Sequence, residues 1–538
     1  MKVALTICPG WTRIKPPLSL ALLAPVLHAQ NYDAHAIDLN NLLYHASREE
    51  YKAQWEQENE FYWTNPAFVS KFIRDHKQVI DTHVNLILDL ESPLIGFSVY
   101  YPNQLMTIEI ARLIKEKDRS KIIVCGGPQC MPELGGIELL RHKWIDAIAL
   151  YEGERTIVAL ANMVEERKKI DYCKGIVFKK DGSLVNCGPQ EAILNIDSLP
   201  FADFSYFTLQ KYANQNELPL LASRGCFWNC AFCVGKLNWQ GYRSQSGERV
   251  FKEVVHQLQK YPEVNFFSFH DCLINGNISM LERFCELVID HRKNGYMKPI
   301  QWWCQAVIRP EMTTVLLEKM KEAGCQRISY GIESGSQKVI DLMGKQFIIS
   351  VASEVIRNTH KSGIKVVTNF MFGFPGEEED DFEQTLEFIE RNKDHIDELL
   401  PVEGLCVIER DSRLYKEAKH YGLYSNPHPH YWKTKDGKNT YLERFRRFEA
   451  LVSKASASRI FLTGAYKKNI DSKKIFLSDY NNYCSSIAFN ICNGLIQKST
   501  GQEYAFIWEI TSQCNFACPY CQAINDYPSS SPLKLLPR

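Results

Sequence analysis

The sequence has no excess of charge of either sign and no long hydrophobic run. Its 63 lysines and arginines balance its 63 aspartates and glutamates, so no overall positive field attracts nucleic acid, and a nucleic-acid substrate is not expected. No apolar run reaches the length of a membrane span. The start, Met1–Thr6, is typical of a first core strand and not of a signal peptide. These absences favour a cytoplasmic protein without a membrane span.

The length and the cysteine content narrow the class of protein further. A chain of 538 residues is too long for one hydrophobic core, so two or three domains are expected. Its 18 cysteines, in a chain without an export signal, indicate reduced thiols and not a disulfide framework. Some of these thiols are therefore candidates for metal ligands.

Three of the cysteines are closely spaced behind an apolar stretch. Cys226, Cys230 and Cys233 form a Cys-x3-Cys-x2-Cys pattern. Three thiolates on one loop can hold three irons of a 4Fe–4S cluster, which leaves the fourth iron open for another ligand. A zinc site and three unrelated core thiols are the structural alternatives. A closed zinc site needs a fourth ligand, and the nearest downstream histidine, His256, stands in a stretch with a helical pattern. The spacing therefore favours a cluster.

This spacing, with the aromatic Phe232 directly before the last cysteine, resembles the signature of the radical S-adenosylmethionine (SAM) enzymes. The resemblance implies that the open iron chelates the amino and carboxylate groups of SAM. Reductive cleavage of SAM then gives a 5'-deoxyadenosyl radical. It also implies that Phe232 contacts SAM and that an electron donor such as a flavodoxin or ferredoxin is a partner.

Residues 1 to about 160 alternate between strand and helix patterns. Such alternation predicts a parallel, doubly wound sheet with helices on both faces, in which a ligand binds beyond the carboxyl ends of the strands. Residues 46–80 are expected as a helical insertion, whose Trp55 and Trp63 belong to the core or cap a cofactor, with core favoured. The expected strands are Val3–Cys8, Ala34–Leu39, Leu94–Tyr100, Lys121–Cys125 and Asp146–Leu150, and the expected helices are Leu18–Gln30, Thr107–Lys117 and one from Glu154.

The loops at the ends of these strands resemble those of the cobalamin-binding domain attached to many radical SAM enzymes. The resemblance covers residues 1–200, linker included, and implies a Rossmann-like cobalamin domain. A sheet that binds a nucleotide, or no ligand, is the alternative. His35 is expected on a strand surface, so no lower histidine ligand to cobalamin is evident. The implied cobalamin contacts are Ser98, Tyr100, Gly126, Gly127, Pro128, Glu152 and Gly153.

A second alternating series begins at Leu218. Its six strand–helix units predict the partial (β/α)6 barrel of a radical SAM core over residues 210–410, with the active site at the carboxyl ends of the strands. The expected strands are Leu218–Ser223, Phe266–Phe269, Gln301–Cys304, Arg327–Tyr330, Lys365–Phe372 and Glu403–Ile408.

Two turns after these strands resemble elements with which the radical SAM family surrounds SAM. Glycines and acidic residues also begin helices for structural reasons, and this is the alternative. The resemblance implies SAM contacts at Gly331, Glu333, Ser334, Gly373, Pro375 and Gly376. The residues that could face the substrate, or belong to the barrel core, are His270, Asp271, Trp302, Gln305, Arg309, Glu403 and Cys406.

The rest of the chain is less informative. Residues 411–503 are expected to form a mainly helical subdomain that closes the barrel, with the basic stretch Tyr441–Lys454 as a solvated face. Residues 504–538 repeat the cysteine spacing at Cys514, Cys518 and Cys521. Too few residues follow to build a second barrel. The segment is either a second cluster site or the stump of a truncated fusion, and the stump is favoured.

The two resemblances together imply a cobalamin-dependent radical SAM enzyme that uses SAM, a 4Fe–4S cluster and cobalamin. The first expectation is a C-methyltransferase that acts on an unactivated carbon of a small-molecule or peptide substrate, by a 5'-deoxyadenosyl radical and methylcobalamin. The cofactors then carry the chemistry and the protein supplies placement. An oxidative cyclisation or rearrangement, with cobalamin as electron carrier, is one alternative. A non-catalytic corrinoid-binding regulatory protein is another. No side chain stands out as a catalytic acid or base.

Overall fold

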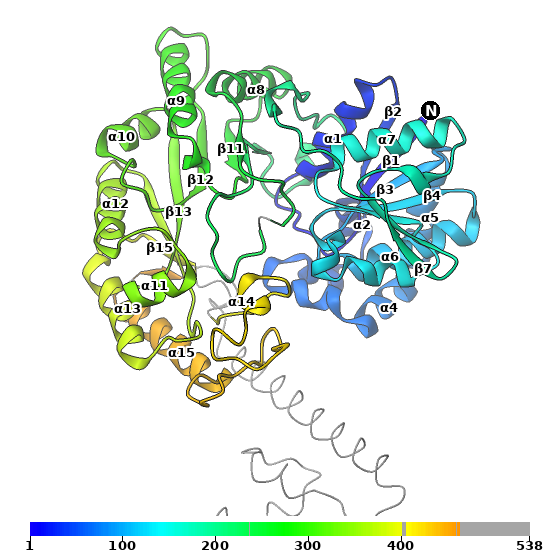
Figure 1. Ribbon diagram of the computed structural model, residues 1–538. Coiled ribbons are helices and arrows are strands. Elements are labelled where there is room, and N and C mark those ends of the chain that lie inside the picture. The colour runs from blue at the N-terminus through cyan, green and yellow to red at the C-terminus, as the bar shows by residue number, and fades with distance from the viewer. Residues whose placement is uncertain (236, 401–404, 459, 463–538) are drawn as a thin grey trace, which may run out of the picture. The chain divides into compact units, whose positions relative to one another are not determined.

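The computed structural model describes residues 1–235, 237–400, 405–458 and 460–462. Residues Met1–Gly464 form one compact unit, and the described residues all belong to it. The unit contains two sheets of seven strands each, coloured blue to cyan and green to orange in Figure 1. Cys514, Cys518 and Cys521 lie outside the described residues, as do residues 463–503 of the expected helical subdomain.

The first sheet is doubly wound, as the sequence predicts. Its strand order is β2-β1-β3-β4-β5-β6-β7. The pairs from β2 to β5 are parallel, and β6 and β7 form an antiparallel hairpin at the edge. The strands are β1 (Lys2–Ile7), β2 (Asp33–Asp38), β3 (Leu94–Ser98), β4 (Ile122–Gly126), β5 (Ala147–Ala149), β6 (Ile176–Lys180) and β7 (Ser183–Asn186). Helices α1 (Leu18–His28), α6 (Gln104–Lys117) and α7 (Gly153–Glu165) connect them.

The order of this sheet determines where a ligand can bind. The connection after β1 leads to β2 on one side, whereas the next connection leads to β3 on the other side. At such a reversal the two loops diverge and leave a crevice at the carboxyl ends of the strands. In this chain the crevice lies between the loops that follow β1 and β3.

The insertion between β2 and β3 is helical, and its tryptophans belong to the core. Trp55 is 4% exposed and Trp63 is 1% exposed. The two rings lie 4.6 Å apart, and the Trp55 indole donates a hydrogen bond to Asn40. The core interpretation of these two residues is therefore confirmed. The insertion contains α2 (Leu39–Ala46), α3 (Glu49–Lys52), α4 (Pro66–Asp75) and α5 (Lys77–Leu88).

The second sheet is parallel throughout and is covered by helices on its outer face. Its order is β16-β15-β14-β13-β12-β11-β8, and Figure 1 shows α9, α10, α12 and α13 on one side of it. Its strands are β8 (Glu217–Leu220), β11 (Phe266–Phe269), β12 (Gln301–Ala306), β13 (Cys325–Glu333), β14 (Lys365–Phe370), β15 (Glu398–Leu400) and β16 (Phe461–Leu462). The helices are α8 (Gly247–Lys260), α9 (Ile278–Lys293), α10 (Thr314–Glu322), α11 (Gln337–Met343), α12 (Ile349–Lys361) and α13 (Glu379–Asn392).

The end of this sheet differs from the sequence prediction in two ways. The sixth strand was expected at Glu403–Ile408, but β15 occupies Glu398–Leu400 and pairs with β14. Leu405 forms only an isolated bridge with Phe372, and Glu403 lies outside the described residues. A seventh strand, β16, pairs with β15. Both strands are too short for a periodic pattern to locate them.

The basic stretch in helix α15 (Tyr441–Ala457) is only partly a solvated face: Arg446 is 50% exposed, but two other arginines are buried, contrary to the sequence prediction. Arg444 is fully buried and Arg447 is 4% exposed. The Arg444 guanidinium lies 3.7 Å from the centre of the Trp432 ring and donates to the backbone oxygens of His430 and Trp432. Arg447 donates to the Glu377 carboxylate at 2.6 Å. The helix therefore uses two buried charges to dock on the turn that follows β14.

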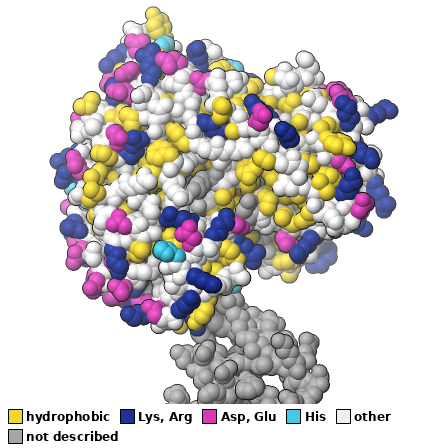
Figure 2. All heavy atoms as spheres, in the orientation of Figure 1, with side chains coloured by type: hydrophobic (Ala, Val, Ile, Leu, Met, Phe, Trp, Pro, Cys, Tyr) yellow, Lys and Arg dark blue, Asp and Glu magenta, His cyan; other side chains and the backbone are white. Residues whose placement is uncertain are grey.

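Charges of both signs are mixed on the face of the molecule that Figure 2 shows. Figure 2 shows Lys and Arg side chains interspersed with Asp and Glu side chains over the visible face of the described residues. None of the helices in the described part of the chain combines the length and the apolar character that a membrane-spanning helix requires.

Candidate active site

The three cysteines of the first motif lie on the loop that follows the first strand of the second sheet. After β8 the chain forms β9 (Ser223–Arg224), which pairs antiparallel with β10 (Arg243–Ser244). Cys226 and Cys230 are half-buried and Cys233 is exposed. Gly225 allows the turn into the loop, because it has φ +77° and a Cβ there would stand 2.5 Å from the Gly241 carbonyl oxygen.

Backbone hydrogen bonds hold this loop against two helices. The Ala231 N–H donates to the Met343 carbonyl at the end of α11 at 2.7 Å, and the Leu414 N–H of α14 (Arg413–Lys416) donates to the Ala231 carbonyl at 2.7 Å. Trp228 is buried and stacks on Phe347, while Phe232 packs on an apolar cluster of buried residues. These contacts therefore fix the loop in place both before and after Cys230, its second cysteine.

Cys230 is the thiol of the loop whose proton is held most clearly by its surroundings. Burial raises the pKa of Cys230 to about 11, and the positive charge of Lys345 opposes that rise. Within the described ranges no three His, Cys, Asp or Glu side chains converge closely enough to hold a metal ion. Three thiols on one short loop nevertheless fit a cluster, whose binding would draw them together and release their protons.

Asp271, at the end of β11, anchors the strand that leads into this loop. Its carboxylate is fully buried and accepts hydrogen bonds from the Ala222 N–H at 3.1 Å and from the Ser223 hydroxyl. Burial raises the pKa of Asp271 to about 6. Because it is 1% exposed, Asp271 holds the loop and does not face a substrate.

The first predicted SAM element, Gly331, Glu333 and Ser334, lies at the end of β13. Glu333 has φ +70°, which is strained for a residue with a side chain, and the pairing of β13 with β14 shifts register there. Its carboxylate lies 3.4 Å from the Lys345 ammonium. Ser334 is fully buried and accepts from the Ser336 N–H, which gives Ser334 a structural role. Contact of these residues with SAM remains a prediction.

The second predicted SAM element, Gly373, Pro375 and Gly376, forms the turn on which α15 docks. Gly373 has φ +74°, and a Cβ there would stand 2.1 Å from the Arg444 side chain. The Gly373 N–H donates to the Glu377 carboxylate. Burial raises the pKa of Glu377 to about 7 although Arg447 lowers it. Packing thus explains Gly373, and SAM contact at this turn remains a prediction.

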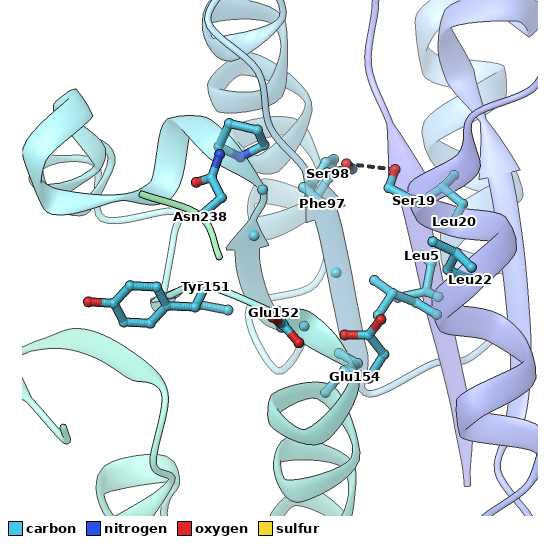
Figure 3. Close-up of a pocket in the computed structure, with 18 of the residues that line it drawn as sticks. Leu5, Ser19, Leu20, Leu22, Phe97, Ser98, Tyr151, Glu152, Glu154 and Asn238 are labelled. Atoms are coloured by element: carbon cyan, nitrogen blue, oxygen red, sulfur yellow. Dashed lines mark hydrogen bonds between the residues drawn. The ribbon is translucent and has the colours of Figure 1, made fainter. Parts of the chain in front are cut away.

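A cavity of about 210 Å³ lies at the carboxyl edge of the first sheet. It is mostly apolar, with Leu5, Leu20 and Leu22 on one side and Tyr151 and Asn238 on the other (Figure 3). All seven residues that the sequence implies as cobalamin contacts line it, namely Ser98, Tyr100, Gly126, Gly127, Pro128, Glu152 and Gly153. Arg224, Asn238 and Trp239, which flank the cysteine loop, complete the lining.

Two buried arginines join this cavity to the cysteine loop. Arg224, two residues before Cys226, donates to Glu152 at 2.9 Å and also to Glu154, while Arg243 donates to both oxygens of Glu152. The four side chains are between 5% and 9% exposed. Glu152 and Glu154 are at the start of α7, where negative charge is also favoured by the helix dipole.

The remaining sequence candidates divide into two groups. His270 and Gln305 are exposed at the ends of β11 and β12, and Arg309 is half-buried and donates to the Asn275 carbonyl. Trp302 and Cys406 do not face a substrate, since both are buried. Trp302 instead packs on Phe269 and Phe284.

Sequence reasoning missed three residues near these sites. One of them is Trp303, the residue after Trp302. The centre of its ring lies 5.7 Å from the centre of the His270 ring and 5.1 Å from the Lys15 ammonium. The alternation of buried and accessible residues along β12 was the available signal for Trp303. Lys15 and Lys345 carry no sequence signal, because both depend on contacts between distant segments.

One protein-family model matches the part of the chain that forms most of the second sheet. The radical SAM superfamily model matches residues 220–389. An uncharacterized methyltransferase of Pyrococcus horikoshii is 24% identical over 57% of this chain and 66% of its own length. An anaerobic magnesium-protoporphyrin IX monomethyl ester cyclase of Rubrivivax gelatinosus is 25% identical over 60% of this chain and 58% of its own length. The chain thus spans about two thirds or less of these two relatives.

A solved structure has a similar fold over most of this chain. The radical SAM methyltransferase TsrM of Kitasatospora setae, with cobalamin and a 4Fe–4S cluster bound, matches with a TM-score of 0.60 and 14% identity. The match covers 83% of this chain and 81% of that protein. At this identity the likeness shows the fold: two α/β domains with parallel sheets, arranged in sequence.

Proposed function

Because residues 220–389 form a radical SAM domain, we propose that this chain is a cobalamin-dependent radical SAM C-methyltransferase. One observation carries the proposal: the cysteine loop is joined by buried ion pairs to a cavity at the carboxyl edge of a doubly wound sheet. A cluster on the loop and a cofactor in the cavity would therefore be neighbours. Similarity to methyltransferases in sequence and in fold supports this assignment.

In the proposed enzyme, Cys226, Cys230 and Cys233 would hold the 4Fe–4S cluster, which would supply the electron that cleaves SAM. The residues proposed for SAM are Phe232, Gly331, Glu333, Ser334, Gly373, Pro375 and Gly376. Cobalamin, when bound, supplies the carrier that passes a methyl group from SAM to an unactivated carbon. The residues of the chain bind and orient these groups and exclude water from them.

The cavity fits an apolar part of a cobalamin. Its leucines and Phe97 offer an apolar lining, and its glycines allow close approach of a ligand to the backbone. At Gly127, φ is +104° and a Cβ would stand 2.8 Å from the Val99 carbonyl oxygen. Ser98 and Ser19, whose hydroxyls are 2.9 Å apart, supply polar groups at the same edge. We therefore assign the seven cavity residues named above to cobalamin.

The proposed partners follow from this chemistry. The substrate is a small molecule or a peptide, and a low-potential donor such as a flavodoxin or ferredoxin supplies electrons. The balance of 63 basic and 63 acidic residues, and the mixed charges on the face that Figure 2 shows, give no support for a nucleic-acid partner. An enzyme of this kind needs a reducing environment, which is why we assign it to the cytoplasm.

The first test is anaerobic reconstitution with iron, sulfide and cobalamin. The native chain should bind about four irons and cobalamin, form 5'-deoxyadenosine from SAM, and transfer label from methyl-labelled SAM to the corrinoid. The triple variant Cys226→Ala/Cys230→Ala/Cys233→Ala should still bind cobalamin but form no 5'-deoxyadenosine. A native chain that binds cobalamin without a reducible cluster would instead be a corrinoid-binding regulatory protein.

A second test concerns the cavity alone. Gly126 has room for a side chain, because a Cβ there would meet only Ala149, at 3.7 Å. Gly126→Val should therefore fill the cavity without backbone strain, lower cobalamin binding at least tenfold and leave the iron content unchanged. The control, Ala67→Val, enlarges an exposed residue of α4 and should leave both unchanged. Native cobalamin affinity in Gly126→Val would exclude this cavity as the site.

A radical cyclisation is the second candidate function, because one of the similar proteins is named as a cyclase. Once a substrate is identified, label from methyl-labelled SAM separates the two reactions. A C-methyltransferase incorporates the label in its product, whereas a cyclase leaves the product unlabelled.

A further inference from the structure

Lys345 is a buried lysine between the cysteine loop and the predicted SAM element. It follows Gly344, whose φ of +73° ends helix α11. The Lys345 side chain is 5% exposed, and a lysine buried to this degree is rare unless its charge has partners. The contacts of its ammonium group therefore indicate the role of this positive charge.

The polar partners of Lys345 all belong to the end of β13. Its ammonium donates to the Gly331 carbonyl at 2.7 Å and lies 3.4 Å from the Glu333 carboxylate. A Cβ at Gly331 would stand 3.3 Å from the ammonium and 2.9 Å from the carboxylate. Glycine at this position thus leaves room for the ion pair, which in turn helps to hold Glu333 at its positive φ.

The aromatic partners of Lys345 come from the cysteine loop and from the chain just after Lys345. The ring centres of Trp228, Phe232 and Phe347 lie 5.8, 5.9 and 5.9 Å from the ammonium. Aromatic faces stabilise a cation and displace water from it. The loop is also bound to the end of α11 through the Ala231 N–H and the Met343 carbonyl. The charge is thereby fixed beside the cysteines and only weakly screened by solvent.

We propose that Lys345 is a positioning residue whose fixed positive charge eases reduction of the cluster held by Cys226, Cys230 and Cys233. This inference rests on the proposed function. Reduction adds one electron to the cluster from a low-potential one-electron donor, and no bond or proton is exchanged in that step. A nearby positive charge stabilises the additional negative charge, so it raises the reduction potential of the cluster. The Lys345 ammonium also pairs with Glu333, a residue that is proposed to contact SAM. The positive charge therefore lies where SAM is expected to bind.

The test is a redox titration of the reconstituted full chain, monitored by electron paramagnetic resonance in the absence of SAM, with dithionite as reductant. In Lys345→Met we expect the ratio of reduced to oxidised cluster at a fixed potential to fall about tenfold, which for a one-electron couple is a negative shift of about 59 mV. Lys345→Gln, which retains a donor for the Gly331 carbonyl but no charge, should shift in the same direction. Lys345→Arg retains the charge and should stay near the native potential.

The matched control is Lys338→Met on α11, the helix that ends just before Lys345. Lys338 is 48% exposed and pairs with Glu378 and Asp381 away from the cysteine loop, so its removal should leave the potential unchanged. Native potentials in Lys345→Met and Lys345→Gln, with full iron content, would overturn the proposal. Loss of iron from both, with Lys345→Arg intact, would also overturn it, because Lys345 would then only support the fold. A native chain without a reducible cluster would instead refute the proposed function.

Discussion

Buried carboxylates define the geometry of this molecule at the scale of single residues. Asp271 accepts two hydrogen bonds from the end of β8 and so fixes the start of the cysteine loop. Asp38 accepts from the Asn41 N–H at 2.9 Å and from the Tyr212 hydroxyl at 2.7 Å, and so ties the linker before β8 to β2. Each carboxylate is more than nine-tenths buried. Their loss should therefore be measurable.

Asp271→Asn replaces the second carboxylate oxygen, which accepts from the Ala222 N–H at 3.1 Å, with an amide NH2 group that faces this donor and has no acceptor there. A buried donor left without an acceptor costs about 1–3 kcal/mol of unfolding free energy. Urea unfolding should show this loss, and the reconstituted variant should release iron faster than the native protein. The control, Glu318→Gln on the exposed side of α10, should change stability by less than about 0.5 kcal/mol. Native stability and iron retention in Asp271→Asn would contradict the anchoring role.

Asp38→Asn should change the pH dependence of stability. Burial raises the pKa of Asp38 from 3.8 to about 6, so the folded protein retains a proton that the unfolded chain loses. The proton that the folded protein retains on Asp38 stabilises the folded state relative to the unfolded state. This stabilisation is fully present below about pH 4 and is lost as the pH rises through 6. The free energy of unfolding of the native protein should therefore fall by about 3 kcal/mol relative to Asp38→Asn between these limits. Urea unfolding at several pH values measures this difference, and a constant difference would contradict it.

At the scale of elements, the junction between α7 and the β9–β10 hairpin joins the two domains. Glu152 accepts from Arg224 and from Arg243, and both arginines are buried. When one partner of a buried ion pair is removed, the other charge is left without compensation in a medium of low dielectric constant. The junction is therefore sensitive to the loss of a single carboxylate.

Glu152→Gln removes that carboxylate and keeps its size. We expect a loss of about 3 kcal/mol in the free energy of unfolding, measured in urea, together with weaker cobalamin binding. The comparison variant is Glu191→Gln, whose side chain is 79% exposed and lies 3.4 Å from Arg155. A surface pair of this kind contributes at most about 1 kcal/mol. Equal effects of the two changes would show that burial of the junction has no energetic consequence.

At the scale of the whole molecule, the described residues contain every part of the proposed site. The cysteine loop, the cavity and Lys345 all lie in the unit Met1–Gly464. A chain that lacks residues 505–538 should therefore keep about four irons and its cobalamin. Iron and corrinoid contents of the truncated and full chains provide the comparison. If the full chain holds about eight irons and the truncated chain about four, Cys514, Cys518 and Cys521 carry a second cluster.

The sequence was sufficient to predict those features of the structure that depend on residues close together in the chain. Apolar runs with alternating helices predicted both parallel sheets, and the resemblance of the strand-end loops to those of a cobalamin-binding domain implied the seven residues that line the cavity. The sequence did not predict the positions of β15 and β16, because strands this short show no periodic pattern of apolar residues. It also failed at α15, since the basic pattern of Tyr441–Lys454 is the same for an exposed face and for arginines that pair with a distant carboxylate.

By itself, then, the sequence determined the two α/β domains, the spacing of Cys226, Cys230 and Cys233, and the loops that surround the cavity. These features depend on residues within a few positions of one another. Only the tertiary structure decided that Arg224 meets Glu152, 72 residues earlier, that Arg447 meets Glu377, and that Lys345 lies among the rings of the cysteine loop. Such pairs form when packed elements bring distant side chains together, and a local pattern carries no record of which side chains will meet.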